Sequence, residues 1–392
     1  MRSVQPNDPM PSERPIRVMM LGLRGCPDVQ GGVERHVERL APLLQRMGCD
    51  VEIVARAPYV RQSAPYTWQG MRVTPLACPT QRSLEAAVHT LRGVLYAARV
   101  RPDILHIHAV GPSLLVPLAR LLGLRVVVTH HGYDYERAKW GRFAKVMLRL
   151  GEFCGMRFAN ARIAVSRAIA GKMQAAHGGI VEAIPNGVDT AAPPSTSGAL
   201  ASFGLEPRRY VLAVGRLVPE KRHLDLIAAF ARAGLAGWKL ALVGAADHPD
   251  AYSQSVEAAA RATPGVVMTG FQKGLALEEL YANAGLFVLP STHEGLPISL
   301  LEALAYGLPC IASDIEANLE VGLPQADYFP ATDVAALADR IAHRAGSGLT
   351  AQERAARRER VLREFDWGTV AQRTVAVYRK ALARAPQDVP VG

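Results

Sequence analysis

The sequence has few cysteines and no long apolar run. Its five cysteines are scattered and none forms a Cys-x-x-Cys pair, which argues against a disulfide framework or a structural zinc site and favours a reducing compartment. No apolar run reaches the roughly 18 residues that a membrane-spanning helix needs. Residues 1–15 are polar and proline-rich, without the apolar centre of a signal peptide. We therefore expect a cytoplasmic protein that begins with a disordered segment at residues 1–15.

A dinucleotide-binding fingerprint is also missing. The first apolar run, residues 17–23, leads into glycines that lack the Gly-x-Gly-x-x-Gly spacing, which argues against an NAD enzyme. Apolar residues at helical spacing follow and predict a helix that ends at Gly48. The pair Gly31-Gly32 lets the backbone approach a ligand closely. A surface loop without a ligand is the alternative.

Charge is distributed unevenly along the chain. The sequence has 45 basic and 35 acidic residues, a net charge of +10, and residues 1–190 hold 25 of the basic and 14 of the acidic ones. A basic first half indicates contact with something anionic, such as a membrane surface, a lipid diphosphate or nucleic acid. An arginine-rich proteome explains the same bias. No basic–aromatic recognition module is present, so nucleic acid is the least favoured partner.

Length and periodicity predict two α/β domains. A chain of 392 residues, 49% of them apolar, can bury two cores. Strands alternate with helices, which is typical of doubly wound parallel sheets. Strands are expected at residues 17–23, 51–55, 104–108, 126–130, 162–165, 210–215, 239–244, 266–270, 285–288 and 309–313. Helices are expected at residues 83–100, 112–122, 137–158, 223–233, 296–305, 332–345, 351–364 and 369–383. A segment rich in Ala, Pro, Ser and Thr predicts a linker at residues 191–205.

The stretch Leu289–Glu302 follows an expected buried strand and carries two carboxylates. Glu294 and Glu302 are eight positions apart, which on a helix leaves their side chains within about 80° of each other. The N-terminus of such a helix offers free N–H groups to a phosphate, and the carboxylates can bind hydroxyl groups beside it. An ordinary strand–turn–helix with two surface acids is the alternative.

Arg216 and Lys221 lie five positions apart, between an expected strand and an expected helix. The planar guanidinium and the compact ammonium can bind the two phosphates of a diphosphate from either side. A charged surface turn is the alternative.

Histidines end two neighbouring strands of the first half, at positions 106, 108, 130 and 131. A His-x-His pair on a strand places both rings on one face, but no acidic residue has metal-ligand spacing, so we expect no metal. His131 precedes Gly132 and can hydrogen-bond a sugar hydroxyl. A core histidine without a ligand is the alternative for His131 and the preferred interpretation for His130.

The segment 137–158 interleaves basic with apolar residues. A helix of this composition can lie on an anionic membrane surface. An amphipathic core helix with a solvated basic face is the alternative.

Five motifs, in order, resemble those of glycosyltransferase family 4, whose members are retaining enzymes with the GT-B fold. They are Gly-Gly-Val-Glu-Arg-His from residue 31, Thr-His-His-Gly from 129, Asn-Gly-Val-Asp from 186, Gly-Arg-x-x-x-x-Lys from 215 and Glu-Gly-Leu-Pro-x-x-x-x-Glu from 294. The sequence from His131 to Gly141 is similar to a subset that builds capsular and extracellular polysaccharides and includes rhamnosyltransferase-like members.

The resemblance implies an α/β fold of the GT-B type, with two Rossmann-like doubly wound parallel-sheet domains and an interdomain cleft. It places an acceptor-binding domain at residues 16–190 and a nucleotide-sugar-binding domain at 206–365. It also implies that residues 366–392 form a helix that packs back on the first domain, followed by a tail.

The resemblance assigns roles to individual residues. Glu302 would bind the ribose, Glu294 the sugar hydroxyls, Arg216 and Lys221 the diphosphate, and His131 would steady the sugar in the transition state. The implied catalytic residues are His131, Glu294, Arg216 and Lys221. The implied donor-binding residues are Gly31, Gly32, Gly215, Arg216, Lys221, Gly244, Phe271, Glu294, Gly295, Leu296, Pro297 and Glu302. The implied acceptor-binding residues are Tyr133, Asp134, Arg137 and Lys139.

The implied enzyme is a hexosyltransferase that moves a sugar from a nucleoside-diphosphate sugar to a lipid-linked saccharide in cell-surface polysaccharide biosynthesis. It would need no cofactor and no metal, and would be cytoplasmic or peripheral at the inner membrane face. No second carboxylate suits a double displacement, which favours front-face attack. A nucleotide-sugar 2-epimerase of the same architecture is the alternative, and it needs no acceptor.

Overall fold

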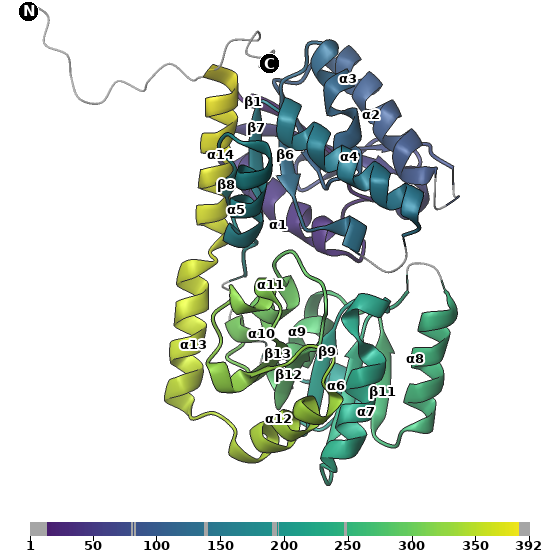
Figure 1. Ribbon diagram of the computed structural model, residues 1–392, viewed down its shortest axis with the longest axis vertical. Helices are drawn as coiled ribbons and strands as arrows, with labels where there is room; N and C mark the ends of the chain where they lie inside the picture. The colour runs from purple at the N-terminus through teal and green to yellow at the C-terminus, as the bar shows by residue number, and fades with distance from the viewer. Residues whose placement is uncertain are drawn as a thin grey trace, which may run out of the picture.

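Two largely parallel sheets, one in each half of the chain, organise the protein (Figure 1). The structure is a computed structural model that describes residues 14–79, 81, 84–136, 140–189, 194, 196–246 and 249–383. Helices cover both faces of each sheet, and the two domains lie one above the other along the long axis. This is the two-domain α/β architecture that the alternation of strands and helices predicts.

The first sheet has the strand order β3-β4-β2-β1-β5-β6-β7-β8. Its strands are β1 (Ile16–Leu21), β2 (Cys49–Arg56), β3 (Tyr66–Trp68), β4 (Met71–Leu76), β5 (Ile104–His108), β6 (Val126–His130), β7 (Ala161–Ala164) and β8 (Glu182–Ala183). The edge strand β3 is antiparallel to β4, so the sheet is mixed at one edge and not wholly parallel as predicted. The sequence signal for this hairpin was Gln69-Gly70, where both residues have positive φ (47° and 81°), as a two-residue hairpin turn requires.

Helices of the first domain connect its strands. They are α1 (Gly32–Arg46), α2 (Glu85–Val100), α3 (Val116–Leu121), α4 (Arg142–Phe158) and α5 (Arg167–His177), with 3₁₀ turns η1 (Ala57–Tyr59), η2 (Pro112–Leu115) and η3 (Asp134–Glu136). The helix expected at 137–158 begins only at Arg142 and follows Gly141. Ser166 caps α5, its side chain accepting a hydrogen bond from Ile169 N.

The second sheet has the strand order β11-β10-β9-β12-β13-β14, and all of its pairs are parallel. Its strands are β9 (Tyr210–Val214), β10 (Lys239–Val243), β11 (Val266–Gly270), β12 (Leu286–Leu289), β13 (Cys310–Ser313) and β14 (Tyr328–Phe329). Its helices and turns are α6 (Gly198–Ser202), η4 (Pro219–Lys221), α7 (His223–Ala233), α8 (Ala251–Ala262), α9 (Gly274–Asn283), α10 (Ile298–Ala305), α11 (Glu316–Leu319), η5 (Gln325–Asp327), α12 (Val334–Ser347) and α13 (Ala351–Glu364). Helix α6 lies inside the segment 191–205 that composition assigned to a linker.

The last helix, α14 (Trp367–Ala383), runs back to the first domain and packs on α1, β6 and β7 (Figure 1). Its Tyr378 is buried and lies 2.7 Å from His106 Nδ1 through its hydroxyl oxygen. The chain therefore crosses between the domains twice, once after β8 and once between α13 and α14. No helix of the described part of the chain is long and apolar enough to cross a bilayer.

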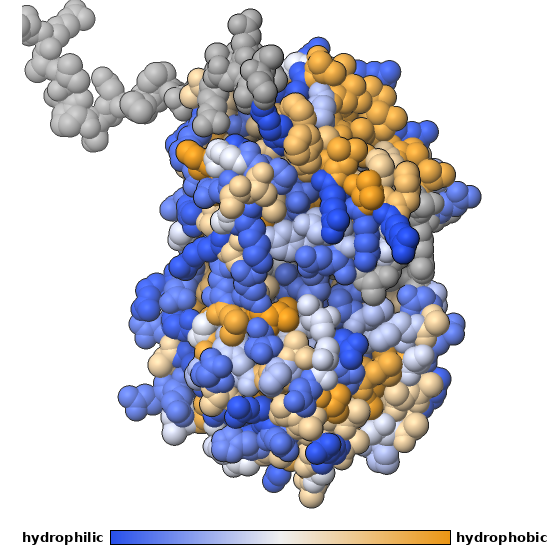
Figure 2. All heavy atoms as spheres, viewed as in Figure 1, coloured by the Kyte–Doolittle hydropathy of each residue, from blue (hydrophilic) through white to orange (hydrophobic). Residues whose placement is uncertain are grey.

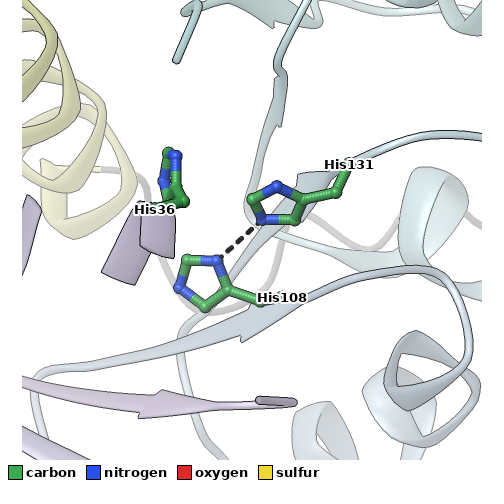
Figure 3. A group of neighbouring side chains, drawn as sticks. All are labelled: His36, His108 and His131. Carbon is green, nitrogen blue, oxygen red and sulfur yellow. Dashed lines mark hydrogen bonds between the residues drawn. The ribbon is translucent and has the colours of Figure 1, made fainter. Parts of the chain in front are cut away.

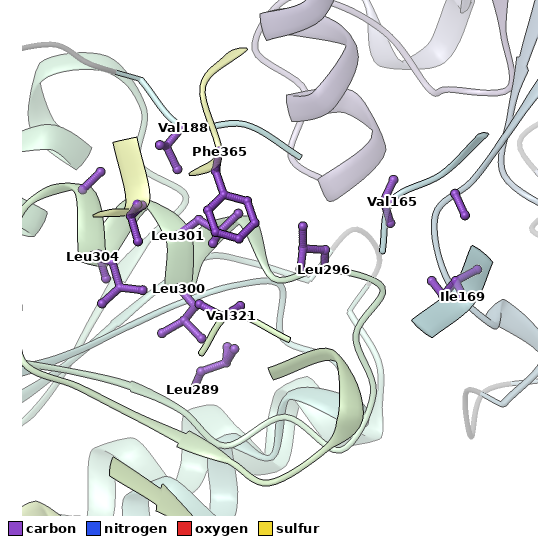
Figure 4. Close-up of a cluster of buried hydrophobic side chains, with 14 of the residues drawn as sticks. Val165, Ile169, Val188, Leu289, Leu296, Leu300, Leu301, Leu304, Val321 and Phe365 are labelled. Atoms are coloured by element: carbon purple, nitrogen blue, oxygen red, sulfur yellow. The ribbon is translucent and has the colours of Figure 1, made fainter. Parts of the chain in front are cut away.

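A shared apolar core joins the two domains. Figure 4 shows Leu296, just before α10, between Phe365 of the second crossing and Val165 of the first domain. Leu296 is 4% exposed and belongs to one buried cluster with residues of both domains. Burial of a leucine side chain contributes about 1.5–3 kcal/mol, so this contact helps to fix the position of the loop that begins with Glu294.

Candidate active site

The carboxyl ends of both sheets face each other across the interface, and two loops meet there through their backbones. A Cβ built at Gly295, after β12, would lie 1.9 Å from the carbonyl oxygen of His131, which follows β6. A Cβ at Gly132 would lie 3.3 Å from Gly295 Cα. Only glycines allow this approach, so the Thr-His-His-Gly and Glu-Gly-Leu-Pro motifs, far apart in sequence, form one site.

Lys221 and Glu294 form an ion pair in this site. Their Nζ and Oε1 atoms are 2.6 Å apart, and the side chains are 19% and 12% exposed. The loops that carry them are tied together, because Thr292 N donates to the Glu220 carbonyl oxygen at 2.9 Å. The structure thus places the predicted diphosphate ligand beside the predicted sugar ligand, at a contact where charge is only partly screened by water.

Arg216 and two of the predicted donor-site glycines, Gly215 and Gly244, lie just after β9 and β10. Gly215 N donates to the Val243 carbonyl oxygen, and Gly244 N to that of Gly270. Gly244 has φ of 141°, and its Cβ would lie 2.0 Å from the Gly215 carbonyl oxygen. Arg216 follows Gly215 at this edge. Phe271, just after β11, is 41% exposed.

Glu302 is the site residue that differs most from expectation. Helix α10 begins at Ile298, so Glu294 lies in the preceding loop and the helical angle between the two glutamates does not apply. Glu302 accepts from Arg35 Nη2 at 2.9 Å and from the Tyr281 hydroxyl at 3.0 Å. Arg35 comes from α1 of the first domain, so this pair crosses the interface. A ribose that reaches Glu302 must share the carboxylate with Arg35 or displace it.

The glycine loop before α1 is held by a buried ion pair. Arg24 Nε lies 3.1 Å from Glu34 Oε1, and the two side chains are 11% and 7% exposed. Burial alone would raise the pKa of Glu34, but the charge and hydrogen bonds of Arg24 outweigh it and lower that pKa below its usual 4.5. Gly31, with φ of 154°, lies against this pair. A Cβ at Gly32 would meet no described atom within 4 Å, so there is open space beside this glycine.

The strand-end histidines separate into two groups. His130 is buried and its Nε2 lies 2.8 Å from Glu152 Oε2, so it is the core histidine that the sequence favoured. His106 bonds to Thr129 and Tyr378. His131 is partly exposed, and its Nε2 lies 3.0 Å from His108 Nδ1. Burial, then neighbouring histidines, lower the pKa of His131 well below 6.5, so its ring is neutral at pH 7.

A pocket of about 150 Å³ lies between the domains, next to Glu294 and Gly295. Tyr133 lines it, and the Tyr133 hydroxyl is buried without a hydrogen-bond partner among the described residues. Asp134 follows at the start of η3. Arg137 and Lys139, the other predicted acceptor ligands, lie outside the described residues.

Sequence reasoning missed several polar residues of the site. Lys172 pairs with Glu316 at the pocket, and His293 Nδ1 lies 3.3 Å from Glu136 Oε2. Each pair joins one domain to the other, so neither shows as a local pattern. Arg35 belongs to the Gly-Gly-Val-Glu-Arg-His motif, for which only the glycines are predicted to contact a ligand.

Comparisons with known proteins agree with this geometry. Residues 30–192 match the family described as Glycosyltransferase Family 4, and residues 208–345 match Glycosyl transferases group 1. The chain is a glycosyltransferase. It is 29% identical to the alpha-maltose-1-phosphate synthase of Mycobacterium tuberculosis over 94% of this chain and 100% of that protein.

Solved structures show the same GT-B fold. The sucrose-phosphate synthase from Thermosynechococcus elongatus superposes with a TM-score of 0.79 at 21% identity, over 94% of this chain and 100% of that one. Anabaena HepE, solved with UDP-glucose, gives a TM-score of 0.75 at 19% identity, over 93% and 99% of the chains. The predicted fold class and the prediction of a glycosyltransferase are confirmed.

Proposed function

We propose that this glycosyltransferase moves a hexosyl group from a nucleoside-diphosphate sugar to a saccharide acceptor with retention of the anomeric configuration. The observation that carries the proposal is the 2.6 Å contact between Lys221 and Glu294, beside the Gly295–His131 backbone contact. It brings a cation suited to a phosphate next to a carboxylate suited to sugar hydroxyls. The transferred sugar would lie between these groups and His131.

The departing diphosphate is stabilised by Arg216 and Lys221 in this proposal. Fixed cations in a partly buried site stabilise developing negative charge more strongly than water does. This is the role that a metal ion has in other transferases, so the proposed transfer step needs no metal. Glu294 holds the sugar, and the leaving phosphate takes the proton of the attacking hydroxyl on the same face.

The nucleoside would bind at the ends of β9–β11, with Glu302 at its ribose. We expect thermal unfolding with UDP-, GDP-, ADP- and dTDP-sugars and free diphosphates to show a raised midpoint for one nucleotide series. A ligand at 100 times its Kd adds about 2.7 kcal/mol to the free energy of unfolding. The same series should give no shift in Glu302→Ala and a full shift in Glu359→Ala, an exposed glutamate of α13.

An absence of any shift in wild type would contradict the donor site. A shift that persists unchanged in Glu302→Ala would contradict the role of this glutamate. Donor turnover measured without acceptor separates transfer from the alternative, nucleotide-sugar 2-epimerisation, because only the epimerase would convert donor alone.

The acceptor proposal rests on an exposed apolar surface over α2, α3 and α4. Figure 2 shows an orange area there, in the same view as Figure 1. On α4, four exposed side chains follow helical spacing on one face: Phe143, Val146, Leu150 and Phe153. Leu91 and Leu95 of α2 and Leu121 of α3 are also exposed. Large exposed apolar patches on soluble domains mark interaction sites.

Basic residues accompany this apolar stripe and indicate an anionic bilayer as its partner. Arg142 and Arg149 are exposed on α4, and Lys145 is partly exposed between them. Apolar side chains that enter the lipid interface, with cations at the headgroups, are the pattern of a peripheral amphipathic helix. We propose that the enzyme acts at the inner face of a membrane on a lipid-linked saccharide, in cell-surface polysaccharide synthesis.

We expect the protein to sediment with vesicles that contain phosphatidylglycerol and not with neutral vesicles. The double variant Arg142→Gln/Lys145→Gln should bind anionic vesicles about 30-fold more weakly, since each basic residue near the surface contributes about 1 kcal/mol. The matched variant Arg261→Gln/Arg363→Gln removes two exposed arginines of the second domain and should bind like wild type. Equal binding by the two double variants would contradict the membrane contact.

A second candidate acceptor is a soluble sugar phosphate. The relative named alpha-maltose-1-phosphate synthase aligns over nearly the whole chain, which favours glucosyl transfer to a small phosphorylated sugar. Transfer assays with glucose 1-phosphate and with a lipid-diphosphate saccharide, run side by side with the donor found above, decide between the two acceptors.

A further inference from the structure

Three histidines from separate elements converge beside the proposed sugar site. They are His36 of α1, His108 at the end of β5 and His131 after β6. One ring nitrogen from each histidine can be chosen so that the three nitrogens lie within 4.8 Å of one another. Figure 3 shows the three rings around a common space, with the hydrogen bond between His108 and His131. His36 and His108 are buried, and His131 is partly exposed. The cluster is therefore reached from the side of His131.

His36 is held in the tautomer that leaves one nitrogen available. Asn186 Nδ2 donates to the Leu296 carbonyl oxygen at 2.9 Å, which fixes the orientation of the amide. The Asn186 Oδ1 atom, 2.9 Å from His36 Nδ1, must then accept a proton from the ring. His36 Nε2 is left with its lone pair. A histidine whose second nitrogen donates to an oxygen is the usual arrangement of a metal ligand.

His108 and His131 can supply the other two nitrogen ligands of the cluster. Their Nδ1 and Nε2 atoms are 3.0 Å apart and share one proton. The remaining nitrogen of His108, Nε2, is buried without a hydrogen-bond partner among the described residues. On a tetrahedral zinc ion, two histidine nitrogens lie roughly 3.4 Å apart, given Zn–N bonds of about 2.0–2.1 Å. To admit an ion the observed pair must open by a few tenths of an ångström, and the ring that donates the hydrogen bond must carry its proton on its other nitrogen instead.

We propose that His36, His108 and His131 form a binding site for a transition-metal dication of the zinc type. Among the described residues the cluster contains nitrogen donors alone, which suit Zn²⁺, Co²⁺ or Ni²⁺ and do not suit Mg²⁺ or Ca²⁺. Three histidines with a fourth position toward the cleft leave room for water or a substrate oxygen. The sequence predicts no metal because no acidic residue has metal-ligand spacing, and His36, the third histidine, lies 72 positions before His108.

We expect a bound metal ion to inhibit sugar transfer. This part of the inference rests on the function proposed above. A metal-bound imidazole loses one nitrogen and has a fixed ring orientation. His131 is the residue that would steady the sugar, so an ion on it competes with that contact. The site would make the enzyme sensitive to free zinc although the transfer step itself uses no metal.

The binding test uses cobalt(II) as a spectroscopic probe on the metal-free, full-length chain. We expect one Co²⁺ per chain, with the visible absorption of a four-coordinate ion, and displacement by Zn²⁺. His36→Gln should bind Co²⁺ at least tenfold more weakly, because loss of even an outer-shell partner costs about 10–100-fold in affinity. His343→Gln, an exposed histidine of α12, should bind like wild type. Thermal midpoints without metal show that the variants are folded, and His36→Asn serves as a second ligand variant.

The inhibition test compares initial rates with and without Zn²⁺ at a concentration that saturates the site. The wild type and His343→Gln should lose at least tenfold in rate, while His36→Gln keeps most of its own metal-free rate. No four-coordinate Co²⁺ spectrum in wild type, or equal affinities of His36→Gln and His343→Gln, overturns the metal site. If Zn²⁺ binds but does not inhibit transfer, the metal site stands and only the proposed competition between the ion and the sugar at His131 is overturned. No transfer by metal-free wild type contradicts the proposed function, and the Co²⁺ titration still decides the site.

Discussion

Replacing Lys221 or Arg216 by alanine should lower kcat by about 10²–10³-fold. Both cations are proposed to bind the diphosphate as it leaves, and removal of one fixed donor that stabilises transition-state charge has this cost in other enzymes. Lys221 is already held at 2.6 Å from Glu294, so it is positioned before substrate binds. Initial rates at saturating donor, together with thermal midpoints to show that the variants are folded, measure the effect.

Two controls belong to this prediction. Asp314 is exposed, and its Oδ1 accepts from Ala331 N at 2.9 Å. Asp314→Ala should change the rate by no more than about twofold, as expected of a surface substitution. Lys239→Ala removes a lysine at the opposite end of β10, where its ammonium bonds to Gly204. Losses of similar, small size in all four variants would mean that Arg216 and Lys221 do not stabilise the leaving group.

Replacing Gly295 by alanine should lower kcat/KM by about 100-fold. The new Cβ would lie 1.9 Å from the His131 carbonyl oxygen and 2.7 Å from its carbon, and backbone on both sides cannot rotate away. The loops that carry Glu294 and His131 must therefore separate by more than 1 Å. A misplacement of about 1 Å at a reacting centre costs roughly 10²-fold in rate.

Gly171→Ala is the matched control for Gly295→Ala. Gly171 lies in α5, where a Cβ would meet no described atom within 4 Å, and alanine favours a helix over glycine by about 1 kcal/mol. This variant should keep full activity and a midpoint equal to or above that of wild type. Wild-type kcat/KM in Gly295→Ala would show that the two loops do not act together.

Local patterns in the sequence located most elements of the fold. β5, β6, β11, α7 and α13 have the bounds that periodicity predicts. The hairpin β3–β4 and the short β8 were missed. β3 has three residues and β8 has two, too few for periodicity to detect, whereas β4 has six. The edge hairpin also makes the first sheet mixed, which apolar runs alone cannot show, because strand direction is set by the connection between strands.

The helix α4 has one buried and one exposed face, and membrane contact through the exposed face stays a prediction. Its buried face includes Glu152, Cys154 and Met156 and packs in the first domain, as an amphipathic core helix does. Its other face exposes Phe143 and Phe153 together with basic residues. Sequence periodicity cannot assign the two faces, because neither carries a purely polar stripe.

The sequence by itself determined the two-domain α/β class and the kinds of side chain at the ends of the strands, because apolar periodicity and turn residues act between near neighbours. It also identified His131, Arg216, Lys221 and Glu294 as candidates from local motifs. Only the tertiary structure decided that Arg35 binds Glu302, that Gly295 touches His131 and that three histidines share one space. Each of these contacts joins residues far apart in the chain, and their positions depend on how the two sheets and the crossing segments pack.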